Sequence, residues 1–138
     1  MAETTGMEPR ISLVTLGVAD LPAATKFYQE GLGLPLDDSF AGVSFFRLHG
    51  TWLSLYPRSE LAKDARTRPE GAGFSGFTLA HNVRTREEVD VLLRTAEEAG
   101  AKIVKPAEQA DWGGYSGYFA DLDGYLWEIA WNPHFWIE

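Results

Sequence analysis

The sequence predicts an α+β protein built from two copies of one βαβββ unit, and three observations support this. Short stretches rich in branched and aromatic residues read as strands, and each half of the chain holds one helical pattern. The order strand, helix, three strands then occurs twice. The tight turn from Asp121 to Gly124 joins the last two predicted strands, because Gly124 can adopt positive φ. A chain of 138 residues, 45% of them hydrophobic, can form one domain with a core, so we expect residues 1–138 to be a single domain.

The first predicted unit covers residues 11–57. It opens with an apolar strand at 11–18, after which Asp20 caps a helix that tolerates Pro22 in its first turn. The helix ends near Gly31, and three strands follow at about 35–40, 43–48 and 52–56. Residues 1–10 are polar and are predicted to be a flexible N-terminal tail.

The second predicted unit covers residues 76–132. A strand at 77–83 leads to Thr85 and Glu88, whose spacing forms a capping box, and Gly100 ends the helix. Strands follow at 101–106, 115–120 and 125–131. An offset of 65 residues carries Val18 onto Val83, and an offset of 74 carries the final strand of the first unit onto that of the second. Residues 58–75 are then the linker, and 133–138 form a C-terminal tail.

Composition excludes several functions. Asp and Glu total 20 against 12 Lys and Arg, giving a net charge of -8 without a basic cluster, so no nucleic-acid partner is expected. No apolar run reaches the roughly 20 residues that a membrane helix needs, and no signal peptide is visible, so we expect a cytoplasmic protein without membrane contact. The absence of Cys excludes disulfides and thiolate chemistry, which leaves His and carboxylates as metal ligands.

Paired βαβββ units, the Asp-x-Asp-Gly turn and a final strand with Glu128 at its centre resemble the vicinal oxygen chelate superfamily. That superfamily includes glyoxalase I, extradiol dioxygenases, fosfomycin-resistance enzymes and bleomycin-resistance proteins. The resemblance implies a curved half-barrel sheet with a concave ligand cleft, helices on its outer face, and a homodimer. It also implies, for metal-dependent members, a His, a second His and a Glu on facing strands.

This chain is predicted to be an atypical member that lacks both metal-binding His residues. Counting seven residues back from Asp20 places the first family His at Leu13, and the repeat offset places the second at Thr78. Only Glu128 keeps a ligand type, and a hydroxyl is a poor ligand for a transition metal. We therefore expect no metal cofactor. A divalent metal stays open as an alternative in which Glu128, water and an oxygen of Asn82 or a Tyr favour Mg²⁺ or Mn²⁺.

The three His residues give no replacement site. His81 has the opposite strand parity to Thr78, so we expect it beneath the helix as a buried, hydrogen-bonded structural residue. His49 reads as a solvated turn residue. His134 belongs to the C-terminal tail, or alternatively covers a neighbouring chain or the mouth of the cleft.

Strand alternation predicts which side chains line the cleft. We expect an apolar wall with a few polar groups, flanked by a flexible lid in which Trp112 and Tyr115 border two glycines; ordinary packing is the alternative for the aromatic residues. Trp127 and Trp131 are expected in the core, and Asp121 and Asp123 only form the turn. The predicted ligand-binding residues are Leu13, Thr15, Trp52, Ser54, Tyr56, Thr78, Asn82, Trp112, Tyr115, Tyr118 and Glu128.

Two functional hypotheses follow. In the first, the protein binds a small aromatic or cationic organic molecule without a metal, in the manner of bleomycin-resistance proteins, and Glu128 is its polar anchor. In the second, the protein is a lyase or isomerase in which Glu128 is the candidate catalytic residue, acting as general base while Tyr56, Tyr118 or Asn82 polarises a carbonyl. The sequence does not decide whether the protein is an enzyme.

Overall fold

The structure is a computed structural model that describes residues 6–37 and 40–134. Parts of the predicted tails (1–5 and 135–138) and of the strand expected at 35–40 (38–39) lie outside the described residues. The chain divides into two compact units, one holding the residues up to Thr25 together with Leu34–Pro69, the other holding Lys26–Gly33 together with the residues from Glu70 onward. No helix of the described residues is long and apolar enough to cross a membrane.

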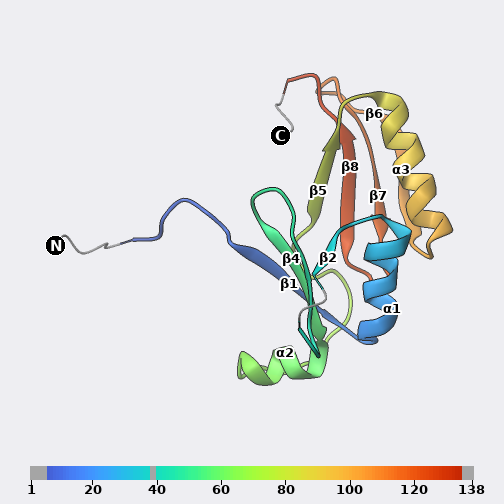
Figure 1. Cartoon of the computed structure of the whole chain (residues 1–138). Coiled ribbons are helices and arrows are strands. Elements are labelled where there is room, and N and C mark those ends of the chain that lie inside the picture. Colours follow the sequence, from blue (N-terminus) through green and yellow to red (C-terminus); the bar gives the residue numbers. More distant parts are fainter. Residues whose placement is uncertain (1–5, 38–39, 135–138) are drawn as a thin grey trace. The chain divides into compact units, whose positions relative to one another are not determined.

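The first unit contains a four-stranded sheet and two helices (Figure 1). Its strand order is β1-β4-β3-β2, with β1 (Leu13–Val18) parallel to β4 (Trp52–Pro57). β3 (Ser44–Phe46) and β2 (Leu36–Asp37) continue the sheet in antiparallel pairing. The helices are α1 (Leu21–Lys26) and α2 (Arg58–Asp64).

The second unit repeats this order. Its sheet runs β5-β8-β7-β6, from β5 (Leu79–Val83) through β8 (Leu126–Trp131) and β7 (Tyr115–Ala120) to β6 (Lys102–Gln109). The long helix α3 (Arg86–Glu98) runs along one face of the sheet (Figure 1). This unit also contains η1 (Phe27–Gly31), the π-helical turn that continues α1.

The strand register confirms the α+β class and the predicted duplication. In the first unit Thr15 lies beside Ser54, and in the second unit Ala80 lies beside Glu128. The offset of 65 carries Thr15 onto Ala80, and the offset of 74 carries Ser54 onto Glu128. Both offsets therefore align the same strand pair, which is expected only if the two units are copies of one architecture.

Both predicted helix starts are confirmed. The Asp20 carboxylate accepts a hydrogen bond from the backbone N–H of Ala23 at 3.0 Å. Thr85 Oγ1 accepts one from the backbone N–H of Glu88 at 3.1 Å, as a capping box requires.

Two segments differ from the sequence expectation. The predicted linker begins with helix α2, because Leu61, Ala62 and Lys63 are good helix formers and Ala62 gains a buried position. β6 continues beyond Pro106 to Gln109, with register irregularities between Ile103 and Glu108. Proline has no N–H for the ladder, so a strand can pass through it only at such an irregularity.

A buried hydrogen-bond network ties η1 to the β7–β8 turn. Asp121, which is only 6% exposed, accepts bonds from the backbone N–H groups of Asp123 and Tyr125 and from the Tyr28 hydroxyl, the last at 2.5 Å. The Tyr28 oxygen in turn accepts a bond from Trp127 Nε1 at 3.0 Å. The prediction that Asp121 only forms the turn is therefore wrong, since its second oxygen also anchors η1.

Burial sets the protonation of this network. Desolvation raises the pKa of the Asp121 carboxyl, and the hydrogen bonds from Tyr28 and the turn amides oppose that rise in pKa. The pKa of Tyr28 is also raised, first by desolvation and then by the charge of Asp121. Tyr28 thus stays a neutral hydrogen-bond donor to Asp121.

Removing the Tyr28 hydroxyl is expected to destabilise the protein. Tyr28→Phe keeps the ring but leaves an oxygen of Asp121 and the Trp127 N–H without their partner, which costs about 1–3 kcal/mol. Urea unfolding followed by circular dichroism measures this change. Tyr56→Phe is the matched control, because the Tyr56 hydroxyl makes no hydrogen bond within the described residues. Equal unfolding free energies for the two variants would contradict the assigned role.

Candidate ligand-binding faces

Glu128 lies at the centre of the sheet face that α3 leaves uncovered in the second unit. Tyr118 of β7 is directly opposite it, and Ala80 of β5 lies on its other side. Direct partners in neighbouring strands share one face, so these three side chains point the same way. The same register adds Asn82, Ser116, Ala120, Leu126 and Ala130 to this face.

The Glu128 carboxylate has no partner on this face. Glu128 is half-buried and makes no hydrogen bond or ion pair with any residue in the ranges 6–37 and 40–134. Its flanking positions carry small side chains, among them Ala80, Ser116 and Ala130. A carboxylate without a protein partner favours a ligand group that donates a hydrogen bond or carries positive charge.

The corresponding face of the first unit carries hydroxyl groups instead of a carboxylate. Ser54, the repeat counterpart of Glu128, is 1% exposed, and its hydroxyl lies 2.6 Å from that of Thr15. The register places further side chains on this face, namely Leu13, Phe45, Trp52 and Tyr56. Thr15 and Ser54 hydrogen-bond each other, so this face carries a neutral hydroxyl pair among aliphatic and aromatic side chains.

Of the predicted ligand-binding residues in the second unit, three lie away from the Glu128 strands or face. Thr78 is exposed and precedes β5 by one residue. Trp112 lies in the β6–β7 turn, with its indole ring against Gly114, where a Cβ would come within 1.8 Å of the ring. Tyr115 is on the side of α3, where its hydroxyl donates to Asp90 at 2.7 Å. Tyr115 and Tyr118 differ by an odd number of residues, which places them on opposite faces.

The segment expected to form a flexible lid is a hydrogen-bonded hairpin turn. The Ala110 N–H donates to the Gly114 carbonyl at 2.8 Å, and the Gly113 N–H donates to the Ala110 carbonyl at 3.0 Å. The Arg86 guanidinium stacks 4.5 Å from the centre of the Tyr115 ring. The hydrogen bond to Asp90 raises the pKa of Tyr115, so this tyrosine acts as a neutral donor beside α3.

The sequence analysis missed Arg47, which contacts the Trp52 ring. Its guanidinium lies 4.8 Å from the ring centre and donates to the Asp37 carboxylate from Nε and Nη2 at 2.9 and 2.7 Å. Strand parity could have indicated this contact. Arg47 is two residues after Phe45 and therefore has the same parity, and Phe45 pairs with Ser54. Continuing the antiparallel register by two residues places Arg47 opposite Trp52. That register depends on the length of the β3–β4 loop, which the pattern alone does not fix.

The His residues take structural or surface positions. His81 pairs with Ile129 and lies on the helix side of its sheet, as predicted. It is exposed, however, and makes no hydrogen bond within the described residues. The expected role as a buried, hydrogen-bonded residue is therefore wrong. The reason is that β5 is an edge strand of its sheet. Partial desolvation still lowers the pKa of His81, and the charge of Glu88 opposes this lowering of the pKa. His49 is exposed, and His134 Nε2 lies 3.3 Å from the Trp112 carbonyl.

The residues present do not fit the family's metal site. The position directly beside Glu128 on β5 is Ala80, two residues after Thr78, and the equivalent pair in the first unit is Thr15 and Ser54. Neither these positions nor those inferred from the sequence carry His. No group of three or more His, Cys, Asp or Glu residues in the described parts of the chain could hold a metal ion. A lone carboxylate supplies one protein ligand, which is too few for a structural or catalytic transition-metal site.

Comparison with known proteins agrees with this architecture. The sequence model of the Glyoxalase/Bleomycin resistance protein/Dioxygenase superfamily matches residues 10–129. A solved structure described as a glyoxalase-related enzyme from Fulvimarina pelagi is 34% identical, with a TM-score of 0.84 over 91% of this chain and 90% of that one. This chain therefore belongs to the glyoxalase/bleomycin resistance protein/dioxygenase superfamily.

Two more distant structures share the fold. A family enzyme from Burkholderia phytofirmans is 24% identical, with a TM-score of 0.78 over 88% of this chain and 98% of that one. A lactoylglutathione lyase from Agrobacterium tumefaciens is 23% identical, with a TM-score of 0.71 over 96% of this chain and all (100%) of that one. The description of the matching superfamily combines proteins of different chemistry. The fold therefore does not identify the function of this chain, which has to be argued from the residues of each sheet face.

The purified protein is expected to retain no stoichiometric transition metal, because Ala80 and Thr15 stand where nitrogen ligands would be needed. The test is dialysis against Mg²⁺, Mn²⁺, Fe²⁺, Ni²⁺ and Zn²⁺ in turn, followed by elemental analysis by plasma mass spectrometry. Glu128→Gln is the matched variant. Near-stoichiometric retention that disappears in Glu128→Gln would show that a metal site exists and would contradict the fit described above.

Proposed function

We propose that this protein is a metal-independent, small-molecule-binding member of the superfamily, and that Glu128 anchors an aromatic or cationic organic ligand. One observation carries the proposal: a half-buried carboxylate in mid-strand has no partner within the described residues. Such a carboxylate can accept a hydrogen bond from a ligand or pair with a cation.

The surroundings of Glu128 favour a flat cation. Tyr118, directly opposite, offers an aromatic face to a cation held by the carboxylate. The residues beside Glu128 on this face include the small Ala80, Ser116 and Ala130, so no bulky side chain stands directly next to the carboxylate at those positions. The net charge of -8 adds a weak general attraction for positive ligands. The homodimer and the cytoplasmic location stay predictions beside this proposal.

Neutralising Glu128 should weaken binding of aromatic cations. A charge-assisted hydrogen bond contributes about 1.5–3 kcal/mol, so Glu128→Gln should raise Kd by about 10- to 100-fold for a cationic ligand. Isothermal titration calorimetry with ethidium and acridinium-type cations measures this. Glu98→Gln, which removes the same charge from an exposed position of α3, is the matched control and should leave Kd unchanged.

Two results would count against the Glu128 anchor. The first is the absence of heat with every aromatic cation in the series. The second is an equal Kd for the wild-type protein and Glu128→Gln. A Tyr118→Leu variant tests the aromatic part of the site, because loss of the ring should weaken the binding of aromatic cations and of alkyl ammonium ions while Glu128 stays in place.

A second candidate function is that of a lyase or isomerase, and the direct pairing of Tyr118 with Glu128 favours it. In this alternative Glu128 takes a proton from carbon next to a carbonyl, and the Tyr118 hydroxyl donates a hydrogen bond to the carbonyl oxygen.

The enzymatic alternative predicts turnover that depends on both residues. In a lactoylglutathione lyase assay, Glu128→Gln should abolish activity, whereas Tyr118→Phe should lower kcat by about 10²-fold with a smaller change in KM. Full activity of Glu128→Gln would eliminate this mechanism.

A further inference from the structure

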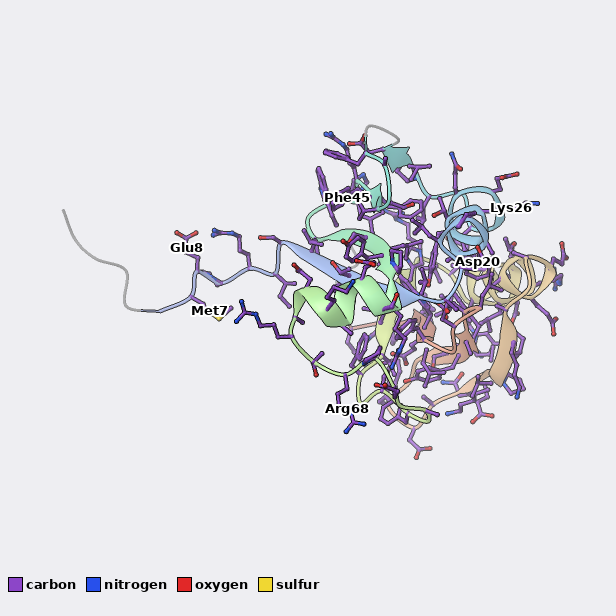
Figure 2. All side chains as sticks on the ribbon, turned by 90° about the horizontal axis from the view of Figure 1, so that it is seen from below. Met7, Glu8, Asp20, Lys26, Phe45 and Arg68 are labelled. Atoms are coloured by element: carbon purple, nitrogen blue, oxygen red, sulfur yellow. The ribbon has the colours of Figure 1, made fainter. Side chains whose placement is uncertain are left out.

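The first unit contains a separate hollow that does not include Glu128. It has a volume of about 1070 Å³ and lies between the segment that leads into β1 and the loop that leads into β4. Figure 2 shows Met7 and Glu8 on that extended leading segment. Pockets for organic molecules typically measure about 300–1,000 Å³, so there is room for a ring system. The lining residues that matter here are Met7, Pro9, Ile11, Leu13, Thr51 and Trp52.

Backbone contacts hold the two walls together. Thr51 Oγ1 donates to the Ile11 carbonyl at 2.7 Å, and the Trp52 N–H donates to the Ser12 carbonyl at 3.0 Å. These bonds extend the β1–β4 contact to the two residues that precede β1. The apolar side chains of the wall stay exposed, with Met7 at 89%, Ile11 at 66% and Leu13 at 41%. The hollow therefore presents apolar surface, and its backbone is held at Ile11 and Ser12.

Trp52 is the aromatic residue of the lining, and its ring is held in place by a neighbouring side chain. Arg47 lies over its ring, and the Asp37 carboxylate, whose side chain is 8% exposed, holds that guanidinium with two hydrogen bonds to one oxygen. Arg47 does not line the hollow, whereas Trp52 does. A ring that is already held in place loses little conformational entropy when a ligand stacks on it.

The charges near the hollow favour an uncharged ligand. Glu8 and Arg10, the two charged residues of the lining, form an ion pair with each other. The charge of Arg47 is matched by Asp37. Apolar surface, an aromatic platform and internally paired charges suit a flat, neutral aromatic ring.

We propose that this hollow, which we call the Trp52 hollow, is a second ligand site that binds an uncharged planar aromatic ring stacked on the Trp52 indole. It is independent of the Glu128 anchor in residues and in ligand charge. The two sites would give one chain separate affinities for a neutral ring and for a cation.

The test uses N-phenyl-1-naphthylamine, an uncharged aromatic probe that fluoresces in apolar surroundings. Trp52→Leu keeps an apolar side chain but removes the platform, and it should raise the Kd of the probe about tenfold. Ile11→Asp places a charge on the exposed wall without altering the sheet and should weaken binding to a similar extent. Trp112→Leu, which removes another partly exposed indole from a turn of the second unit, is the matched control and should leave Kd unchanged.

Nuclear magnetic resonance locates the probe. The indole N–H signal of Trp52, assigned from its absence in Trp52→Phe, should shift during the titration, and Glu128→Gln should give the same Kd as wild type. The proposal is overturned if the probe does not bind, if Trp52→Leu binds it as tightly as wild type, or if the Trp52 signal stays in place while others move. Loss of cation binding in Glu128→Gln with intact probe binding would support both sites separately.

Discussion

The buried carboxylate of Asp121 is the constraint on which the second unit depends. One of its oxygens closes the β7–β8 turn through two backbone N–H groups, and the other accepts the Tyr28 hydroxyl. The turn fixes the register that sets Tyr118 opposite Glu128. The Tyr28 contact holds η1 on the opposite face of the sheet, where it packs beside Trp127 and Phe119. A single buried acid thus organises one face for packing and leaves the other open.

The two units have the same strand arrangement but carry different polar groups at equivalent positions. At equivalent positions, the first unit has a pair of hydroxyls that satisfy each other, while the second has a carboxylate beside an alanine. The two hydroxyls of the first unit hydrogen-bond each other, so their polar atoms need no further partner. The Glu128 carboxylate has no hydrogen-bond partner within the described residues. The two units thus carry different polar groups at the same position of one architecture.

Much of the fold follows from local sequence pattern. The repeat, both helix starts and the Asp-Leu-Asp-Gly turn were predictable because capping residues, turn residues and strand alternation act over a few neighbouring positions. Alternation predicted one cleft wall that includes Thr15, Trp52, Ser54, Asn82 and Glu128. Within each sheet the register agrees with this parity, since Thr15, Trp52 and Ser54 share one face of the first sheet and Asn82 and Glu128 share one face of the second. The strand boundaries near Pro106 and the helix after Pro57 were less predictable, since tertiary packing decides how far an element continues.

The sequence by itself determined the duplicated βαβββ order and the parity of each strand. Only the tertiary structure decided that Asp121 meets Tyr28, 93 positions away in the chain, that Arg47 covers Trp52, and that Tyr115 turns toward α3. The physical reason is one of range. Periodicity records which side of a strand a residue occupies, whereas partners across strands and helices depend on loop lengths, register and competition for buried space, which no short segment encodes.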